Sequence, residues 1–220
     1  MFYLIIFICF CCRNNVKKVL FVPYASAKPD SYDEYTEKVG TVLRQWGLEV
    51  EGIHTMGSEI EALKNAQAVF IGGGNSFLLL KTLYDKHLVE AIRSRVLDDG
   101  IPYIGSSAGT NVSTLSISTT NDMPICLPPT FYALQLVNFN INPHYQDPEI
   151  NGTHKGETRE DRIKEFHYLN DNPVLGLREG SSLLVDGDEA TLIGHTSARL
   201  FQRDQEPKEF PPNSDMSFLL

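Results

Sequence analysis

Hydrophobic and polar positions follow two distinct patterns along the first half of the chain. Short apolar, β-branched runs such as 16–25 and 68–74 are typical of buried strands, whereas 30–47 repeats apolar side chains at three- and four-residue spacing, as on one helix face. Gly47 ends that helical pattern. The same patterns predict strands over 48–56 and 101–107, a short helix over 59–66, one long helix or two shorter ones over 75–100, and a helix from about residue 108.

Strands that alternate with helices predict an α/β fold, with a mostly parallel sheet and helices on both of its faces. In this architecture the functional groups gather at the carboxyl ends of the strands. Two glycine-rich turns follow predicted strands, at Gly72–Gly74 and Gly105–Gly109. These turns are therefore the first places to search for chemistry.

The second half of the chain is β-rich. Residues 134–145, 173–194 and 198–210 read as short strands and loops, and Asp186-Gly187-Asp188 between apolar runs is a hairpin signal. Neither an internal repeat nor a linker interrupts this part. We therefore predict a single α/β domain over residues 16–220 with a β-rich C-terminal part.

Residues 1–15 form an atypical apolar segment. Its run MFYLIIFICFCC ends at Arg13 and lacks both the basic start and the cleavage site of a secretory signal. The run is also shorter than the about 20 residues of a membrane-spanning helix. A buried strand or aberrant N-terminus, a signal-like segment and a membrane-associating stub stay open, and we expect no stable membrane association.

Charge and cysteine content narrow the range of functions. The chain has 220 residues and a net charge of −9, which disfavours a nucleic-acid-binding surface. Three of the four cysteines lie in the first twelve residues and none forms a CxxC pair, so no disulfide framework is visible. This favours a reducing compartment, and we expect a cytoplasmic protein.

The stretch 105–109, GSSAG, fits the pattern G-x-S-x-G with Ser107 at its centre. In this pattern a strand turns sharply into a helix, and the glycines let the backbone approach closely around the serine. The hydroxyl is exposed at the start of the helix, where the amide of Ala108 points at any oxyanion. The alternative is a serine that caps an ordinary strand-to-helix turn, and Ser106 is the weaker nucleophile candidate.

A serine nucleophile needs a base and a group that orients the base. His144 follows an apolar strand and the rigid Pro143, so it is the best placed of the six histidines, although a structural role stays open. Asp122 and Glu179 are candidate carboxylates, and each also fits as a turn residue.

A second source of oxyanion donors is the turn Gly72–Gly74 with the following Asn75. The amides of Gly73 or Gly74 could complete an oxyanion hole. Alternatively, the turn uses glycine only because its backbone needs a positive φ.

Several motifs in order resemble the S51 family of serine peptidases, the peptidase E or α-aspartyl dipeptidase family. The similarity covers residues 16–220, and the family's first strand is replaced here by the apolar segment. The motifs that carry it are FIGGGNSFLLL, IPYIGSSAGTNV, INPHY, GETREDRIKEF and LREGSSLLVDGDEATLIG.

The resemblance implies a flavodoxin-like or class I glutamine amidotransferase-like fold and cleavage of Asp-X dipeptides without metal or cofactor. It makes Ser107 the nucleophile and His144 the base, with Asp122 or Glu179 as the third member. Arg159 in GETREDR is implied as the cation that binds the substrate carboxylate, with Arg162 nearby; both also fit a charged helix surface.

The expected partner is therefore a small acidic dipeptide, and a homodimer is possible. Two alternatives stay open. One is a cyanophycinase-like exopeptidase, and the other is a truncated, non-catalytic variant of the family, because the apolar segment 1–15 stands where the family has its first strand.

Overall fold

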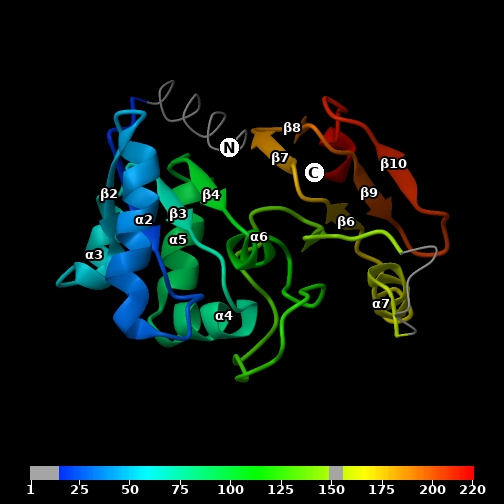
Figure 1. The fold of residues 1–220 in the computed structure, drawn as a ribbon, viewed down its shortest axis with the longest axis horizontal. Coiled ribbons are helices and arrows are strands. Elements are labelled where there is room, and N and C mark those ends of the chain that lie inside the picture. Colours follow the sequence, from blue (N-terminus) through cyan, green and yellow to red (C-terminus); the bar gives the residue numbers. More distant parts are fainter. Residues whose placement is uncertain (1–14, 149–155) are drawn as a thin grey trace. The chain divides into compact units, whose positions relative to one another are not determined.

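The computed structural model describes residues 15–148 and 156–220, so the predictions for the apolar N-terminal segment lie almost entirely outside the described residues. The described part forms two compact units (Figure 1). The first unit runs to Ile117 and resumes over Asp122–Leu136, and the second comprises Ser118–Asn121 and Val137–Leu220. The single domain expected over 16–220 stays a prediction.

The first unit contains a four-stranded sheet in the order β2-β1-β3-β4, and every neighbouring pair is parallel. Val69 of β3 pairs with Leu20 on one side and Tyr103 on the other. The parallel sheet predicted from the apolar runs is therefore confirmed. Its strands are β1 (Lys18–Val22), β2 (Glu49–Gly52), β3 (Val69–Ile71) and β4 (Tyr103–Gly105).

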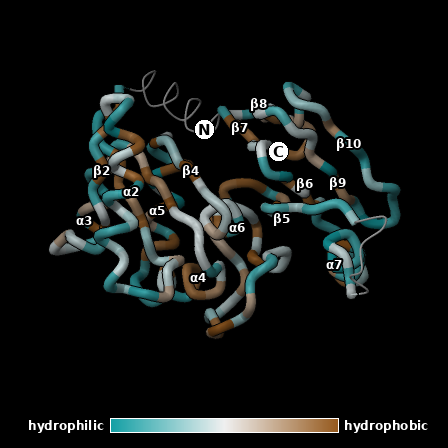
Figure 2. Tube along the Cα trace, in the orientation of Figure 1, coloured by the Kyte–Doolittle hydropathy of each residue, from teal (hydrophilic) through white to brown (hydrophobic). Residues whose placement is uncertain are grey.

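Helices cover both faces of this sheet, as predicted. Successive side chains of a strand point to opposite faces, so Phe21 packs with Leu43 of α2 (Tyr32–Arg44) while Val22 packs with the helices of the other face. Figure 2 shows the hydrophobic residues of this unit gathered in its interior. The helices of the other face are α3 (Glu59–Lys64), α4 (Ser76–Asp85) and α5 (Leu88–Leu97), and α6 (Ala108–Ser113) follows β4.

One of the two predicted alternatives is observed over 75–100, and one predicted strand ends early. The helical pattern over 75–100 is divided between α4 and α5 by His87, whose φ of 56° is left-handed. The strand predicted over 48–56 ends at Gly52, and the 3₁₀ turn η2 (Ile53–Thr55) follows. Another such turn, η1 (Pro29–Ser31), precedes α2.

The second unit is β-rich, as predicted. Its four-stranded sheet has the order β10-β9-β6-β5, in which β5 and β6 are parallel and the other pairs antiparallel. The predicted hairpin turns at Gly187, with a φ of 59°, and joins β7 (Ser181–Asp186) to β8 (Glu189–Gly194). The remaining elements are β5 (Asn140–Pro143), α7 (Arg159–Phe166), β6 (Val174–Leu177), β9 (Ala198–Phe201), β10 (Lys208–Phe210) and η3 (Ser217–Leu219).

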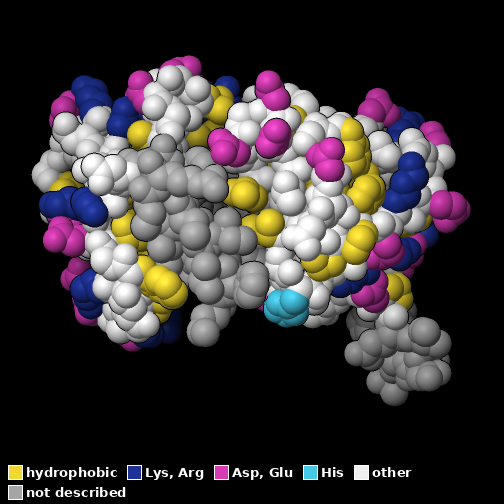
Figure 3. Space-filling model, turned by 90° about the horizontal axis from the view of Figure 1, so that it is seen from above, with side chains coloured by type: hydrophobic (Ala, Val, Ile, Leu, Met, Phe, Trp, Pro, Cys, Tyr) yellow, Lys and Arg dark blue, Asp and Glu magenta, His cyan; other side chains and the backbone are white. Residues whose placement is uncertain are grey.

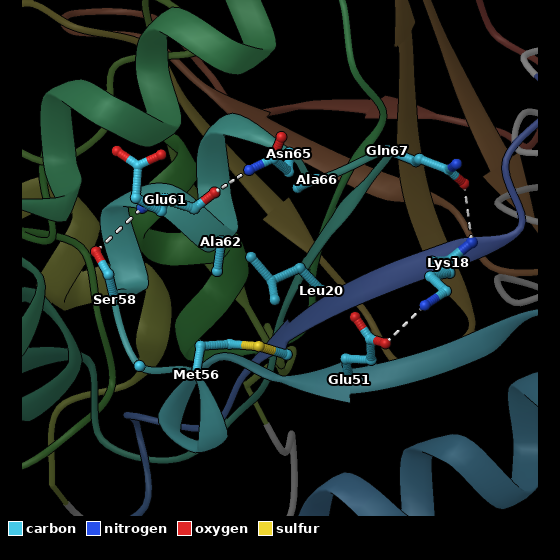
Figure 4. A pocket seen from close by; sticks show the side chains of 11 residues that line it. Lys18, Leu20, Glu51, Met56, Ser58, Glu61, Ala62, Asn65, Ala66 and Gln67 are labelled. Atoms are coloured by element: carbon cyan, nitrogen blue, oxygen red, sulfur yellow. Dashed lines mark hydrogen bonds and ion pairs between the residues drawn. The ribbon is translucent and has the colours of Figure 1, made fainter.

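A pocket of about 400 Å³ in the first unit lies away from the glycine-rich turns (Figure 4). It runs along α3 from Lys18, the first residue of β1, and its lining includes Glu51, which pairs with Lys18 at 2.8 Å. Functional groups of a parallel sheet gather at the carboxyl ends of the strands. Ser107 follows such an end, that of β4, and is not among the residues lining this pocket.

The surface of the described residues carries mixed charge. Figure 3 shows acidic and basic side chains interspersed over the visible face, without a basic stripe. None of the helices in the described ranges combines the length and the apolar character that crossing a bilayer requires.

Candidate active site

Ser107 occupies a sharp corner between a strand and a helix. β4 ends at Gly105, α6 begins at Ala108, and Ser107 between them has φ 55° and ψ −107°. A residue with a side chain seldom adopts this backbone conformation, which persists only where the surrounding structure holds it. The corner therefore has the strained geometry that G-x-S-x-G predicts, and Ala108 is among the first amides of α6, which lack an intrahelical acceptor.

Close backbone packing explains the two outer glycines of this motif. A Cβ on Gly109 would lie 2.1 Å from the carbonyl oxygen of Ile71 in β3, and a Cβ on Gly105 would lie 2.5 Å from the carbonyl oxygen of Gly109. Tyr103 donates its hydroxyl to the Gly109 carbonyl at 2.7 Å. Burial raises the pKa of Tyr103, which keeps this donor protonated. α6 is thus pressed directly onto the sheet beside Ser107.

The glycine turn after β3 lies against the serine. A Cβ on Gly73 would stand 3.1 Å from the Cβ of Ser107 and 3.7 Å from its Oγ. The amide of Gly73, however, donates to the phenol oxygen of Tyr35 at 2.9 Å. A role for Gly73 as an oxyanion donor would require this bond to be exchanged for one to the substrate. Gly74, with φ 143°, stays a predicted donor from this turn.

Asn75 and Asp122 meet at the start of α4. Asn75 caps the helix, because its Oδ1 accepts from the amide of Leu78 at 3.0 Å while its Nδ2 donates to the carbonyl of Met123 at 2.8 Å. Asp122 accepts from the Ser76 amide at 2.7 Å. Both polar atoms of the Asn75 side chain are thus engaged in this helix start, and its predicted substrate contact stays a prediction.

His144 and Glu179 are brought together in the second unit. His144 follows β5 directly with a left-handed φ of 56°, and its Nδ1 hydrogen-bonds to the Glu179 carboxylate. Glu179 lies two residues beyond β6, which pairs with β5. A carboxylate on Nδ1 favours the tautomer whose Nε2 accepts a proton. Asp122, the other candidate carboxylate, belongs to the first unit.

Arg159 lines a small pocket of the second unit. It is the first residue of α7, whose start is fixed by a capping box between Thr158 and Asp161. Arg162 lines the same pocket and pairs with Glu157 at 3.8 Å. The pocket measures about 40 Å³ and is lined by Ser118, Thr119, Thr120, Asn121, Asn142, Arg159, Arg162, Ile163 and Phe166.

An asparagine pair joins this pocket to the strand that carries the histidine. Asn121 donates to the carbonyl of Pro143 at 2.7 Å, and Asn142 donates from Nδ2 to both Asn121 Oδ1 and the Thr119 carbonyl, each at 2.8 Å. Asn142 is 3% exposed, and its Oδ1 is buried without a hydrogen-bond partner. The guanidinium groups that line this pocket suit a carboxylate.

Three side chains near the candidate residues were missed by the sequence analysis: Tyr35 at the glycine turn, Asn142 in the pocket wall and Arg178 beside Glu179. Each acts through a contact with a residue distant in the sequence, 38 positions away for Tyr35 and Gly73. Residue patterns in one sequence carry no signal for such contacts.

Comparison with known proteins gives one consistent result. Residues 5–193 match the model of peptidase family S51. A Drosophila melanogaster protein named as a probable alpha-aspartyl dipeptidase is 54% identical over 94% of this chain and 85% of its own length. Peptidase E of Streptomyces coelicolor is 52% identical over 92% of this chain and 82% of its own.

Solved structures agree. A candidate peptidase E from Listeria monocytogenes EGD-e superposes with a TM-score of 0.61 and 27% identity, covering 82% of this chain and 87% of that one. A peptidase from an acI-B1 Actinobacterium shares the fold, with a TM-score of 0.72 and 17% identity over 98% of this chain and 90% of that one.

Proposed function

Because the chain belongs to peptidase family S51, we propose that it is a serine-type dipeptidase that hydrolyses dipeptides with an N-terminal aspartate. The observation that carries the proposal is the strained corner at Ser107, with a glycine turn packed against its side chain. A serine that only capped a helix would have no need of this conformation. Relatives named alpha-aspartyl dipeptidase and peptidase E, about half identical to this chain, support the substrate class.

In the proposed reaction Ser107 Oγ attacks the peptide carbonyl of Asp-X while His144 accepts the hydroxyl proton. Amides of Ala108 and Gly74 stabilise the oxyanion of the tetrahedral intermediate. The protonated His144 then gives its proton to the leaving amine, which departs as the free amino acid X. Water, deprotonated by His144, attacks the aspartyl ester, and His144 returns this proton to Ser107 Oγ as aspartate leaves.

Glu179 is the proposed third member of the triad. Its contact with His144 Nδ1 supports this role, because a carboxylate there holds the tautomer and stabilises the imidazolium. Asp122 instead binds an amide at the start of α4. We therefore assign Asp122 to the loop structure of the first unit in this proposal.

Arg159 is the proposed recognition site for the aspartate side chain. The pocket of about 40 Å³ has room only for a small group. Its two arginines, Arg159 and Arg162, suit a carboxylate. Arginine at this position supplies a fixed fork of donors that matches the carboxylate.

Partners and location follow as part of the proposal. The substrate is a small acidic dipeptide, the protein acts in the cytoplasm, and neither nucleic acid nor a membrane is a stable partner. A homodimer is proposed as the assembly, and sedimentation velocity at two protein concentrations tests it. No metal or cofactor enters the reaction, so dialysis against a chelator should leave the rate unchanged.

The decisive experiment measures hydrolysis of Asp-Leu, Glu-Leu and Leu-Leu. Ser107→Ala should abolish both Asp-Leu cleavage and labelling by a serine-directed phosphonate, whereas the matched variant Ser106→Ala should keep both. Arg159→Met should remove the preference for Asp-Leu more than Arg162→Met does. Absence of hydrolysis and labelling in the folded wild type would refute the dipeptidase, and preferential cleavage of β-aspartyl peptides would favour a cyanophycinase-like activity.

A further inference from the structure

We propose that Arg178 is a positioning residue for the general base, because it fixes the segments after β5 and β6 that contain His144 and Glu179. This inference rests on the proposed function. Arg178 touches neither of these residues through its own hydrogen bonds, which go to Asp147, Glu209 and the Ser197 carbonyl. It therefore acts through the geometry of the His144–Glu179 pair and not on the substrate.

Every N–H of the Arg178 guanidinium is used. Nε and Nη2 donate to the two oxygens of Asp147, each at 2.7 Å, and Nη1 and Nη2 donate to the two oxygens of Glu209, each at 2.9 Å. The fifth donor reaches the Ser197 carbonyl at 2.9 Å. Two bidentate carboxylate pairs on one guanidinium give both strength and a fixed orientation. Four chain segments are thus joined at Arg178.

The position of this cluster along the chain explains what it fixes. The β5–β6 ladder ends at Pro143 and Leu177, and the amide of Tyr145 adds one further bond to the Leu177 carbonyl at 3.0 Å. His144 lies at this end of the ladder, between Pro143 and Tyr145, and Glu179 lies two residues beyond Leu177. The Arg178–Asp147 pair joins the two segments beyond this end of the ladder, because Asp147 lies three residues after His144 and Arg178 directly precedes Glu179.

The side chains of the catalytic pair lie at the surface. The side chains of His144 and Glu179 are 51% and 80% exposed, so packing restrains them weakly. Arg178, in contrast, is 19% exposed and lies over the ring of the buried Tyr145 at 5.4 Å. Exposed ion pairs contribute little on their own, whereas a partly buried and saturated one holds its neighbours in place. Arg178 is therefore suited to hold the chain beside both members of the pair.

Arg199 provides a matched control. It shares Glu209 with Arg178, at 3.1 Å, but its other carboxylate partner is Glu160 on α7, at 3.0 Å. Arg199 is similarly buried, at 25% exposure. Arg199→Met removes the ion pairs to Glu209 and Glu160 but leaves the bonds between Arg178 and Asp147 in place.

The test is a double-mutant cycle with Asp-Leu as substrate. Arg178→Met should lower kcat by about tenfold to a hundredfold with KM changed less than about threefold, because a base displaced by about 1 Å loses rate and not binding. Arg199→Met should stay within about threefold of wild type. Arg178→Lys, which keeps the charge but loses the fork, should restore only part of the rate.

In the Glu179→Gln background the Arg178→Met change should add less than about threefold, since the pair it positions is already broken. An equal loss in both backgrounds, or an equal loss for Arg199→Met, would overturn the inference. If Arg178→Met fails to fold, by thermal melting, Asp147→Asn replaces it with the same expected outcomes. A wild type that does not cleave Asp-Leu would instead refute the proposed function, so the two failures are distinguishable.

Discussion

The packing of α6 on the sheet gives a sharp prediction for Gly109→Ala. The added methyl would lie 2.1 Å from the backbone oxygen of Ile71, whereas ordinary Cβ contacts begin near 3.4 Å, so α6 and β3 must separate by more than 1 Å. Overpacking of this kind costs about 1–3 kcal/mol, and a backbone neighbour places it near the upper end. Alanine itself favours a helix over glycine by about 1 kcal/mol, which works against the effect.

For a protein of this size, 1 kcal/mol corresponds to about 2–4 °C in Tm. A net loss of about 2 kcal/mol should therefore lower the Tm of Gly109→Ala by about 4–8 °C in differential scanning calorimetry. Gly57→Ala is the control, because a Cβ there meets nothing within 4 Å and the backbone is not left-handed. It should change Tm by less than about 2 °C. Equal Tm values for the two variants would refute the close packing that holds the Ser107 corner.

Three further outcomes are expected. Gly73→Ala would place a methyl 3.1 Å from Ser107 Cβ. It should leave Tm within about 3 °C but lower kcat/KM for Asp-Leu at least about tenfold. Unchanged kinetics would contradict the placement of Gly73 beside Ser107. Glu179→Gln should lower kcat by about 10³–10⁴, because it removes the carboxylate bonded to His144. Asp122→Asn should mainly lower the free energy of unfolding, by about 1 kcal/mol, at the start of α4. A larger loss of kcat for Asp122→Asn than for Glu179→Gln would make Asp122 the third member of the triad. Hydrogen bonds from Arg178 lower the pKa of Asp147 and of Glu209, so the folded state binds fewer protons than the unfolded state. The stability that these pairs contribute is full above about pH 4.3, the pKa of an unfolded glutamate. It is lost as the pH falls through the lowered pKa values of the folded state. The gap in urea midpoint between wild type and Arg178→Met should therefore narrow below about pH 4, and a gap constant from pH 7 to pH 2 would contradict this.

The sequence predicted the first unit well because its signals are local. Apolar runs marked the strands, and G-x-S-x-G marked the corner at Ser107, whose unusual backbone is set by its own neighbours and by β3. The hairpin at Gly187 was equally local. The break at His87 was predicted only as one of two alternatives, because the histidine interrupts the helical pattern through its left-handed φ and not through its residue type.

The arrangement around the base was predicted only in part. The sequence left Asp122 and Glu179 as alternatives, because the bond that distinguishes them joins positions 35 residues apart. The engagement of the Gly73 amide by Tyr35 and the saturated guanidinium of Arg178 were not foreseen either. These contacts depend on register between distant strands and loops, and residue types alone do not fix that register.

The four residues Ser118–Asn121 belong to the second unit, although the chain on both sides of them belongs to the first. The boundary between the units is therefore crossed three times, and no single cut yields two intact fragments. A gene split at codon 137 would express a C-terminal piece without the donors and acceptors that Thr119 and Asn121 supply to Asn142 and Pro143. Activity from two separately expressed halves should thus appear only when Ser118–Asn121 of the N-terminal piece bind to the C-terminal piece.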